Sequence, residues 1–460
     1  MISLNFNEKE SLFVQLYEYI KKEIISGSLE RDTLLPSKRN LATHLGISIN
    51  TVIKAYENLI DEGYIYSKER IGYFVSPVEN ILNIKNNDTI VKKDKKIVSK
   101  YNFDLNKNAN FSFPNTNYKK VLNESLLEKE ELSKRDIKGL QCLRHSIKNY
   151  LKSARNVDVA EESIIISSGI EYLFQILFYI MPQDTVFGLE NPGYRDLKNL
   201  FEMNNKKYVF QNIDSDGIII ENREINAFLI TPSHQFPTGN IMPIGRRVEL
   251  LNYVQKINGY ILEDDYDSEF KYYGRPIPAL KSLDKPDRVV YISNFSKSIS
   301  PTLRVSFMVL PKKLLQKYES IKPFYNCPVP NIVQLSLSKY IDEGYFEKHL
   351  NRMRRKYDDK RKFTISFFEN NELYKIRDKK AGMHFILEIK TEIKEQEIIK
   401  KMKQQNIYVE GLAKYYEGEV KYKYPRIIIG YGNMKDKELK EAIQIFKKVV
   451  EDMVRYKKVL

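Results

Sequence analysis

The chain has 460 residues, of which 42% are hydrophobic and 29% charged, with 75 Lys and Arg against 60 Asp and Glu. This composition excludes a disordered chain, the length predicts two unequal domains, and the formal net charge of +15 favours a polyanionic partner but also suits plain solubility. Two distant cysteines without metal-ligand spacing, and no apolar run of roughly 18 residues, argue against a disulfide framework, a metal site and a membrane span, so we expect a cytoplasmic protein.

The N-terminal segment predicts a helix-turn-helix. Apolar positions repeat with helical spacing over 12–25. A Pro-Ser pair begins a second helix, a tight turn around Gly46 follows, and Ser48 caps a third helix. The outward face of that third helix carries Ile49, Asn50, Thr51 and Lys54. Two helices joined by such a turn suit the major groove of DNA, although helical pairs of this spacing also occur in other α domains.

A β-hairpin wing is expected after the third helix. The stretch GYIYSKERIGYFVS alternates apolar and polar residues on both sides of a turn that Gly72 permits. From LFVQLYEYIKK to ERIGYFV, the chain resembles the GntR family of winged helix-turn-helix regulators over the whole length of the module. The resemblance places at the DNA Arg39, Ser48, Asn50, Thr51, Lys54 and the wing glycine Gly72. Ile49 stands where the family commonly has Arg; it can meet a thymine methyl group but cannot clamp guanine.

Residues 77–102 predict a flexible linker between a DNA-binding domain over 1–76 and a large domain over 103–460. The stretch is polar, rich in Asn and Lys, and has no sustained period of 3.6 or 2. Its Lys92-Lys93 and Lys95-Lys96 pairs either contact phosphates or are solvated, and solvation is the commoner case.

The large domain predicts a mostly parallel sheet with helices on both faces. Apolar, β-rich runs alternate with helical patterns and begin near Ile164, Val186, Ala227, Gly259 and Arg288. Sheets of this kind bind ligands at the carboxyl ends of their strands. Polar residues follow three of these runs, at Ser168-Gly169, Asp264-Asp265-Tyr266 and Ser296-Lys297. We therefore expect the site at this edge.

Lys297 is the candidate for covalent cofactor chemistry. It follows an apolar strand in a segment of Ser and Asn, and Arg304 stands seven positions further on. A lysine alone is usually a solvated surface group, but an amine beside hydroxyls and a guanidinium suits an aldehyde that carries a phosphate, which is pyridoxal 5'-phosphate (PLP). The pyridine nitrogen needs an anion, for which Asp264 is the candidate, and Tyr266 would reach the phenolic oxygen. A helix cap or a solvated acid is the alternative for Asp264.

From Phe103 to its end, the chain resembles fold-type I aminotransferases, in the version fused to GntR domains and called MocR or GabR-like. The matching segments are SSGIEYLFQIL, ENPGYRD, TPSHQFPTGNIMPIGRR, LEDDYDSEF and NFSKSISPTLRVSFMVLP. The resemblance implies an internal aldimine on Lys297, Asp264 at the pyridine nitrogen, Tyr266 at the phenolate oxygen and Tyr194 stacked on the ring. It places around the phosphate Arg304, Ser296, Asn294, Ser168, Gly169 and Ile170. For Tyr194, core packing as a turn aromatic is the alternative.

Departures from the aminotransferase pattern bear on whether the domain turns over a substrate or senses one. Phe236 stands where ordinary aminotransferases have Asn, and Asn294 replaces a Ser or Thr but can still donate a hydrogen bond. Lys414 stands where amino-acid-sensing relatives have the Arg that holds a carboxylate, and Lys fits a carboxylate less selectively. Arg195 and Arg426 are further effector-binding candidates, each also compatible with a structural role.

We interpret the chain as a transcription regulator: a small α+β winged helix-turn-helix followed by a large α/β aminotransferase-like domain of fold-type I. It would sense an amino compound, or PLP itself, at Lys297 and control genes of amino-acid or vitamin B6 metabolism. The alternative is an active aminotransferase with an appended DNA-binding module; we favour a sensor with at most partial transamination. The expected partners are a double-stranded DNA operator, the effector, and a second copy of the chain in a homodimer, domain-swapped head to tail.

Overall fold

The computed structural model describes residues 4, 6–7, 10–77, 99–104, 113–221, 224–272, 278–321, 326–377, 381–420 and 422–459. The chain divides into two compact units, Met1–Lys96 and Ile97–Leu460. The lysine pairs expected in the linker, Lys92-Lys93 and Lys95-Lys96, lie outside the described residues. Within the described ranges, no helix combines the length and the apolar character that a membrane crossing requires.

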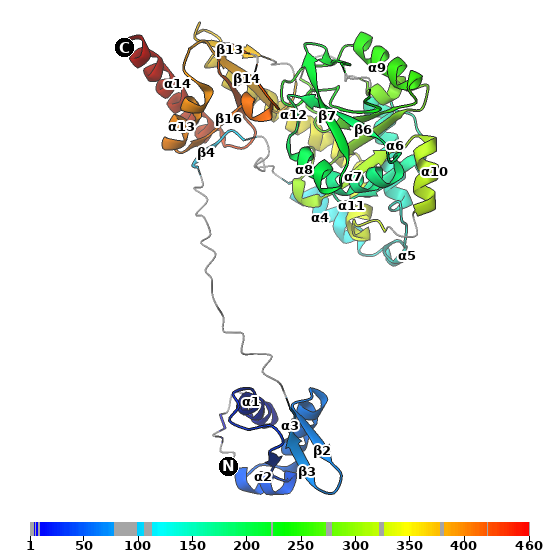
Figure 1. Ribbon diagram of the computed structural model, residues 1–460, viewed down its shortest axis with the longest axis vertical. Coiled ribbons are helices and arrows are strands. Elements are labelled where there is room, and N and C mark those ends of the chain that lie inside the picture. Colours follow the sequence, from blue (N-terminus) through cyan, green and yellow to red (C-terminus); the bar gives the residue numbers. More distant parts are fainter. Residues whose placement is uncertain are drawn as a thin grey trace. The chain divides into compact units, whose positions relative to one another are not determined.

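The N-terminal unit contains three helices and a three-stranded antiparallel sheet (Figure 1). Its elements are α1 (Leu12–Ile25), β1 (Leu34–Leu35), α2 (Lys38–Leu45), α3 (Ile49–Asp61), β2 (Ile65–Lys68) and β3 (Gly72–Val75). Ser37 and Ser48 cap α2 and α3, because each side-chain oxygen accepts a hydrogen bond from a backbone amide at 3.2 Å. The apolar face of α3 packs with Val52 and Tyr56 fully buried. The predicted helix-turn-helix and wing are confirmed.

An eight-stranded sheet forms the centre of the large unit, in the order β5-β12-β11-β10-β9-β6-β7-β8. Its strands are β5 (Ile164–Ser167), β6 (Val186–Asn191), β7 (Lys207–Asp214), β8 (Gly217–Ile218), β9 (Ala227–Ile230), β10 (Tyr260–Asp265), β11 (Val289–Asn294) and β12 (Ser306–Val309). The five central strands from β11 to β7 run parallel, whereas β12 is antiparallel to both of its neighbours and β8 is antiparallel to β7. The predicted, mostly parallel sheet is confirmed.

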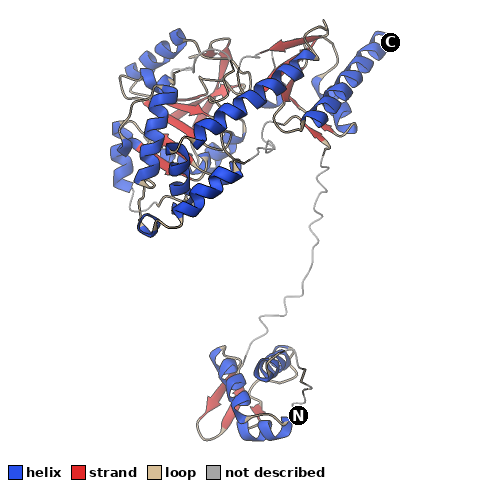
Figure 2. Ribbon diagram, turned by 180° about the vertical axis from the view of Figure 1, so that it is seen from behind, coloured by secondary structure: helices blue, strands red, loops and turns tan. Residues whose placement is uncertain are grey.

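Helices cover both faces of this sheet (Figures 1 and 2). They are α4 (Asn115–Ser125), α5 (Lys129–Ser133), α6 (Gln141–Arg155), α7 (Ile170–Ile180), α8 (Asp196–Met203), α9 (Ile244–Lys256), α10 (Lys312–Ile321) and α11 (Asn331–Asp342). Strand residues alternate between two cores: Ile165 of β5 packs in one cluster with Phe174 of α7. Its neighbours Ile164 and Ile166 pack in another cluster with Leu143 of α6. A strand buried on both sides needs no polar alternation, which explains the continuous apolar runs.

A second sheet, four-stranded and antiparallel, follows in the order β13-β14-β17-β16. The elements of this region are α12 (Tyr345–Ser366), β13 (Tyr374–Arg377), β14 (His384–Ile389), α13 (Glu395–Gln404), β15 (Ile407–Tyr408), β16 (Glu410–Gly411), β17 (Arg426–Gly430) and α14 (Asp436–Val459). The sequence predicts one domain over 103–460, and no pattern in it indicates this second sheet.

The large unit also includes residues that we expected in the linker. Tyr101–Asn102 forms strand β4, which pairs in parallel with β15. The Tyr101 ring is buried, and its hydroxyl donates a hydrogen bond to Glu441 at 2.7 Å. The predicted linker 77–102 therefore extends too far at its end. No local pattern reveals this, because the partner strand lies about 300 positions later in the chain.

Candidate functional site

A cavity of about 340 Å³ lies at the carboxyl ends of the central strands. Eight of the ten residues predicted to bind the cofactor line it: Ile170, Tyr194, Asp264, Tyr266, Asn294, Ser296, Lys297 and Arg304. The other two, Ser168 and Gly169, directly precede α7 at its edge. Met383 and His384, from the region of β14, close the cavity from the second sheet. The structure thus assembles the predicted cofactor residues around one hollow.

Asp264 has a buried oxygen that lacks a hydrogen-bond partner. Its Oδ1 atom meets no donor among the described residues. Burial raises the pKa of Asp264 to about 7, and the neighbouring charges of Asp265, Asp267 and Glu190 contribute to the rise. A protonated pyridine nitrogen is a cationic N–H donor, which would satisfy this oxygen and stabilise the carboxylate. Asp264 therefore fits the pyridine end of PLP.

Lys297 lies beyond the end of β11, half-buried in the wall of the cavity. Burial lowers the pKa of its amine, while the charges of Asp267 and Asp104 oppose the shift. A lowered pKa increases the share of uncharged amine, and the uncharged form is the one that attacks an aldehyde. Lys297 therefore fits the aldehyde end of PLP.

The start of α7 and Arg304 form an anion-binding corner. Gly169 caps α7 with φ 94°, and a Cβ atom there would lie 2.3 Å from Arg304 Nη2, so a side chain would exclude the guanidinium. Backbone amides at a helix N-terminus together with a guanidinium suit a phosphate. Arg304 Nη2 donates a hydrogen bond to Glu171 Oε2 at 3.0 Å. A phosphate would compete with this carboxylate, whose role the sequence analysis missed.

Two tyrosines border the middle of the cavity. Tyr194 packs edge-on against Phe236, with ring centroids 5.8 Å apart, so its ring is held at the cavity wall. Tyr266 Oη lies 2.9 Å from Nδ1 of His234. His234 stands in the segment TPSHQFPTG, and no role was predicted for it from the sequence. The signal that was available is the position of this histidine directly after a predicted strand.

The three residues expected to hold an effector carboxylate are absent from the described lining of this cavity. Each is ion-paired with a glutamate: Arg195 with Glu417 at 2.8 Å, Lys414 with Glu410, and Arg426 with Glu388 at 2.9 Å. Two of these glutamates also pair with a second cation, Glu388 with Arg377 and Glu417 with Lys198. The structure places the three expected effector residues outside this cavity, and their effector-binding role stays a prediction.

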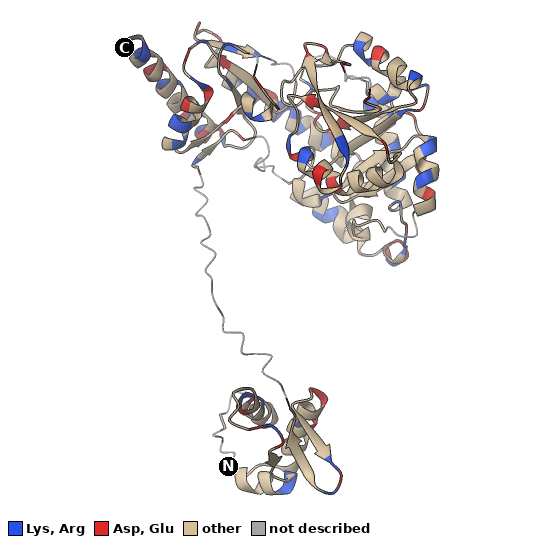
Figure 3. Ribbon diagram, viewed as in Figure 1, with Lys and Arg blue, Asp and Glu red and all other residues tan. Residues whose placement is uncertain are grey.

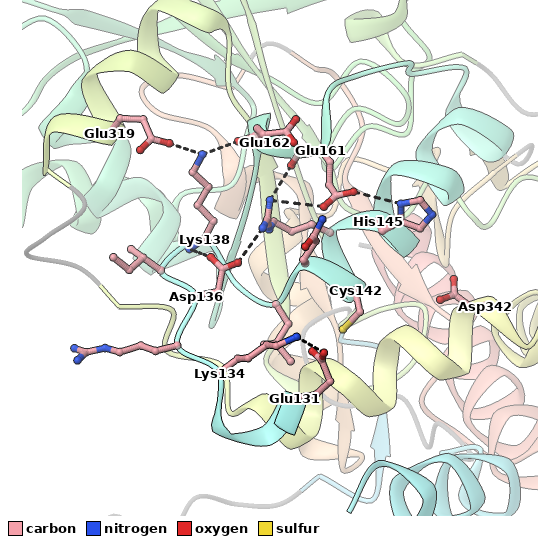
Figure 4. A pocket seen from close by; sticks show the side chains of 15 residues that line it. Glu131, Lys134, Asp136, Lys138, Cys142, His145, Glu161, Glu162, Glu319 and Asp342 are labelled. Atoms are coloured by element: carbon pink, nitrogen blue, oxygen red, sulfur yellow. Dashed lines mark hydrogen bonds and ion pairs between the residues drawn. The ribbon is translucent and has the colours of Figure 1, made fainter. Parts of the chain in front are cut away.

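A larger hollow of about 950 Å³ lies beside α5 and α6 (Figure 4). Several of its charged side chains pair with one another: Arg144 pairs with Asp136 at 2.9 Å, and Nδ1 of His145 lies 3.3 Å from Glu161. Figure 4 also shows Lys138 extending toward Glu319, with which it pairs. Across the described parts of the chain, no group of His, Cys, Asp and Glu is arranged to hold a metal ion. We interpret the ion pairs that line this hollow as structural, because they hold the segment before α6 in place.

The predicted DNA contacts lie on α2, α3 and the wing. Arg39, Asn50 and Lys54 are exposed, and Lys and Arg gather at the turn of the wing (Figure 3). The hydroxyls of Ser48 and Thr51 lie 2.9 Å apart, so in the free protein they serve the helix cap. Gly72 begins β3 with φ 147°, and a Cβ atom there would lie 2.9 Å from the Leu34 side chain. The family resemblance predicts that Gly72 lies at the DNA. The structure shows in addition that the backbone conformation and the close packing at this position favour a glycine.

Comparison with known proteins identifies the family. The model for aminotransferase class I and II matches residues 100–446, and the model for bacterial regulatory proteins of the gntR family matches residues 12–75. The HTH-type transcriptional regulator YdeL of Bacillus subtilis is 33% identical over 95% of this chain and 96% of its own length. The chain belongs to the MocR-like regulators.

Two further regulators are similar to the MocR-like regulator over most of its length, and a solved aminotransferase shares the fold of its large domain. The probable rhizopine catabolism regulatory protein MocR of Rhizobium meliloti is 27% identical over 96% of this chain and 94% of its own. The pyridoxine biosynthesis regulator PdxR of Corynebacterium glutamicum is 29% identical over 84% and 85%. The aminotransferase LysN of Thermus thermophilus, solved with a phosphopyridoxyl ligand, shares the fold with TM-score 0.66 and 20% identity over 78% and 94%. The MocR-like regulator is a DNA-binding protein whose large domain uses PLP as its cofactor.

Proposed function

We propose that Lys297 holds PLP in this transcription regulator and that the occupancy of its cavity controls operator binding. The observation that carries the proposal is one cavity that joins a half-buried amine of lowered pKa to a half-buried carboxyl group with a buried, unsatisfied oxygen. Asp264 would hold the pyridine nitrogen, Tyr266 the phenolic oxygen, and Arg304 with the first amides of α7 the phosphate. When bound, PLP supplies a carbonyl carbon that reacts with amines.

PLP itself is the effector that the described lining favours. Once the phosphate engages Arg304 and the aldehyde engages Lys297, the described lining offers no further lysine or arginine for an amino-acid carboxylate. Asp104 and Asp196 also line the cavity and repel a carboxylate. The name of the relative PdxR, a pyridoxine biosynthesis regulator, supports vitamin B6 genes as the target. An amino compound without a carboxylate is the second candidate, since the same acids favour a cationic amine.

We further propose that the regulator is a cytoplasmic homodimer, domain-swapped head to tail. Two DNA-binding modules in such a dimer would engage repeated or palindromic half-sites. The fold-type I resemblance supports the dimer. The side chain of Phe236, which cannot donate a hydrogen bond, stands where ordinary aminotransferases have Asn and supports a sensor with at most partial transamination.

The test uses full-length, PLP-free protein and an operator selected from a random DNA library. PLP is added alone, with the diamine putrescine, or with alanine, and operator affinity is followed by fluorescence anisotropy. Borohydride reduction and peptide mass spectrometry then locate the cofactor. We expect the label on Lys297 and an altered operator affinity with PLP alone. A label on another lysine would overturn the site, and an affinity that is unchanged in every arm would overturn the sensing function.

A further inference from the structure

Buried His234 connects Tyr266 to Asp267 behind the cavity. Its Nδ1 atom lies 2.9 Å from Tyr266 Oη and 2.9 Å from Asp267 Oδ2. The exposed fraction is 2% for His234 and 3% for Asp267, so water does not substitute for these contacts. Tyr266 and Asp267 line the cavity, whereas His234 lies one layer deeper.

The Nδ1 atom of His234, which contacts both Tyr266 and Asp267, determines whether the Tyr266 hydroxyl donates or accepts a hydrogen bond there. A carboxylate only accepts hydrogen bonds, so the contact with Asp267 requires a hydrogen on Nδ1. A nitrogen that carries this hydrogen has no lone pair with which to accept a bond from Tyr266. The Tyr266 oxygen therefore accepts a share of the same N–H, and its own hydrogen is left for a different acceptor.

Packing holds the imidazole in this orientation. Gly382 has φ 74°, and a Cβ atom there would lie 2.0 Å from Cε1 of His234, so the backbone itself covers the ring. On another side, the ring of His384 lies with its centroid 5.4 Å from that of His234. His384 is in turn held by a contact of 2.9 Å between its Nε2 and the carbonyl of Pro237. The histidine therefore has little freedom to turn away from Tyr266.

We propose that His234, fixed by Asp267, is a positioning residue that keeps Tyr266 as a hydrogen-bond donor toward the phenolic oxygen of PLP. The inference rests on the proposed cofactor site and extends it to a residue that does not line the cavity. The hydrogen bond from Tyr266 is especially important in this chain, because the Phe236 side chain offers no donor where ordinary aminotransferases have Asn.

The experiment compares His234→Phe, Tyr266→Phe and the double variant in the full chain. The readouts are the dissociation constant of PLP and the pH midpoint of the visible absorption band of the bound cofactor. A donor to the phenolic oxygen draws charge from it and weakens its hold on the proton that it shares with the neighbouring nitrogen, so losing the donor raises the midpoint. We expect Tyr266→Phe to raise it by roughly one pH unit and to weaken PLP binding about tenfold.

His234→Phe should raise the midpoint in the same direction, and the double variant should match Tyr266→Phe alone. His234→Leu tests the same link if His234→Phe does not fold, and His145→Phe in the other hollow is the matched control. An unchanged midpoint in both His234→Phe and His234→Leu, or a double variant with additive shifts, overturns the role of His234. Wild-type protein without any visible band in the presence of PLP overturns the cofactor site as well.

Discussion

Replacing Asp264 by Asn should stabilise the PLP-free protein and weaken its binding of PLP. In PLP-free protein, burial raises the pKa of Asp264 from 3.8 to about 7. Above pH 7, the folded chain therefore carries a carboxylate at a cost that the unfolded chain does not have. At 1.36 kcal/mol for each tenfold change in acidity, this cost reaches roughly 4 kcal/mol at pH 8, as an upper bound.

The sign of the pH dependence follows from the raised pKa. As the pH falls below 7, the folded carboxyl group takes up a proton and the cost declines until it vanishes near the unfolded pKa. The amide of the Asp264→Asn variant does not titrate, so its folded state carries no such cost at any pH. The gain in the free energy of unfolding should therefore be larger at pH 8 than at pH 5.5 by roughly 2 kcal/mol. Urea unfolding of PLP-free protein at both pH values measures this difference.

The same substitution removes the anion that pairs with the pyridine nitrogen. A hydrogen bond to a charged group contributes about 1.5–3 kcal/mol, so PLP should bind about 10- to 100-fold more weakly at pH 8. Asp184→Asn, at an exposed position outside the cavity, is the control. A variant that binds PLP as tightly as the wild type, or that is less stable than it at pH 8, would refute the assignment of Asp264.

Four further outcomes are expected. Glu171→Gln should tighten PLP binding about two- to fivefold in an absorbance titration, because the phosphate no longer competes with an exposed ion pair; weaker binding would contradict this. Lys297→Ala should lose the visible band and the PLP response in anisotropy while keeping basal DNA binding, whereas a full response would exclude the proposed chemistry. Arg39→Ala should reduce the slope of log affinity against log salt by about 1, and an unchanged slope would place Arg39 away from phosphates. Arg426→Ala should leave the effector response intact and lower the free energy of unfolding by about 1 kcal/mol, because Glu388 loses one of its two arginine partners and keeps Arg377; a lost response at unchanged stability would support an effector role for Arg426.

The N-terminal unit could be predicted almost element by element because the signals are local. The helical spacing over 12–25 coincides with α1, and the capping serine Ser48 directly precedes α3. Apolar periodicity and capping depend on neighbours within one or two turns of the chain, so no knowledge of the tertiary fold is needed. The ends of the buried strands could also be predicted from local sequence, because polar residues directly follow the apolar runs.

The groups that support the cofactor residues could not be predicted, because they come from distant parts of the sequence. Glu171 and Arg304 are 133 positions apart, yet their side chains form an ion pair at the anion-binding corner. His234 and Asp267 are 33 positions apart and meet only because their strands end at the same edge of the sheet. A single sequence contains no periodicity that links such pairs.

By itself, the sequence determined a winged helix-turn-helix, an α/β sheet and the strand-end residues Asp264 and Lys297, since these follow from local pattern and recognisable motifs. Only the tertiary structure decided which charges face the cavity. Arg195, Lys414 and Arg426 are equally plausible carboxylate binders in the sequence, but the fold places all three outside the described cavity lining and pairs each with a glutamate. The position of a charge relative to a cavity depends on distances of a few ångströms, which are defined only once segments far apart in the sequence, such as β14 and β17, lie side by side.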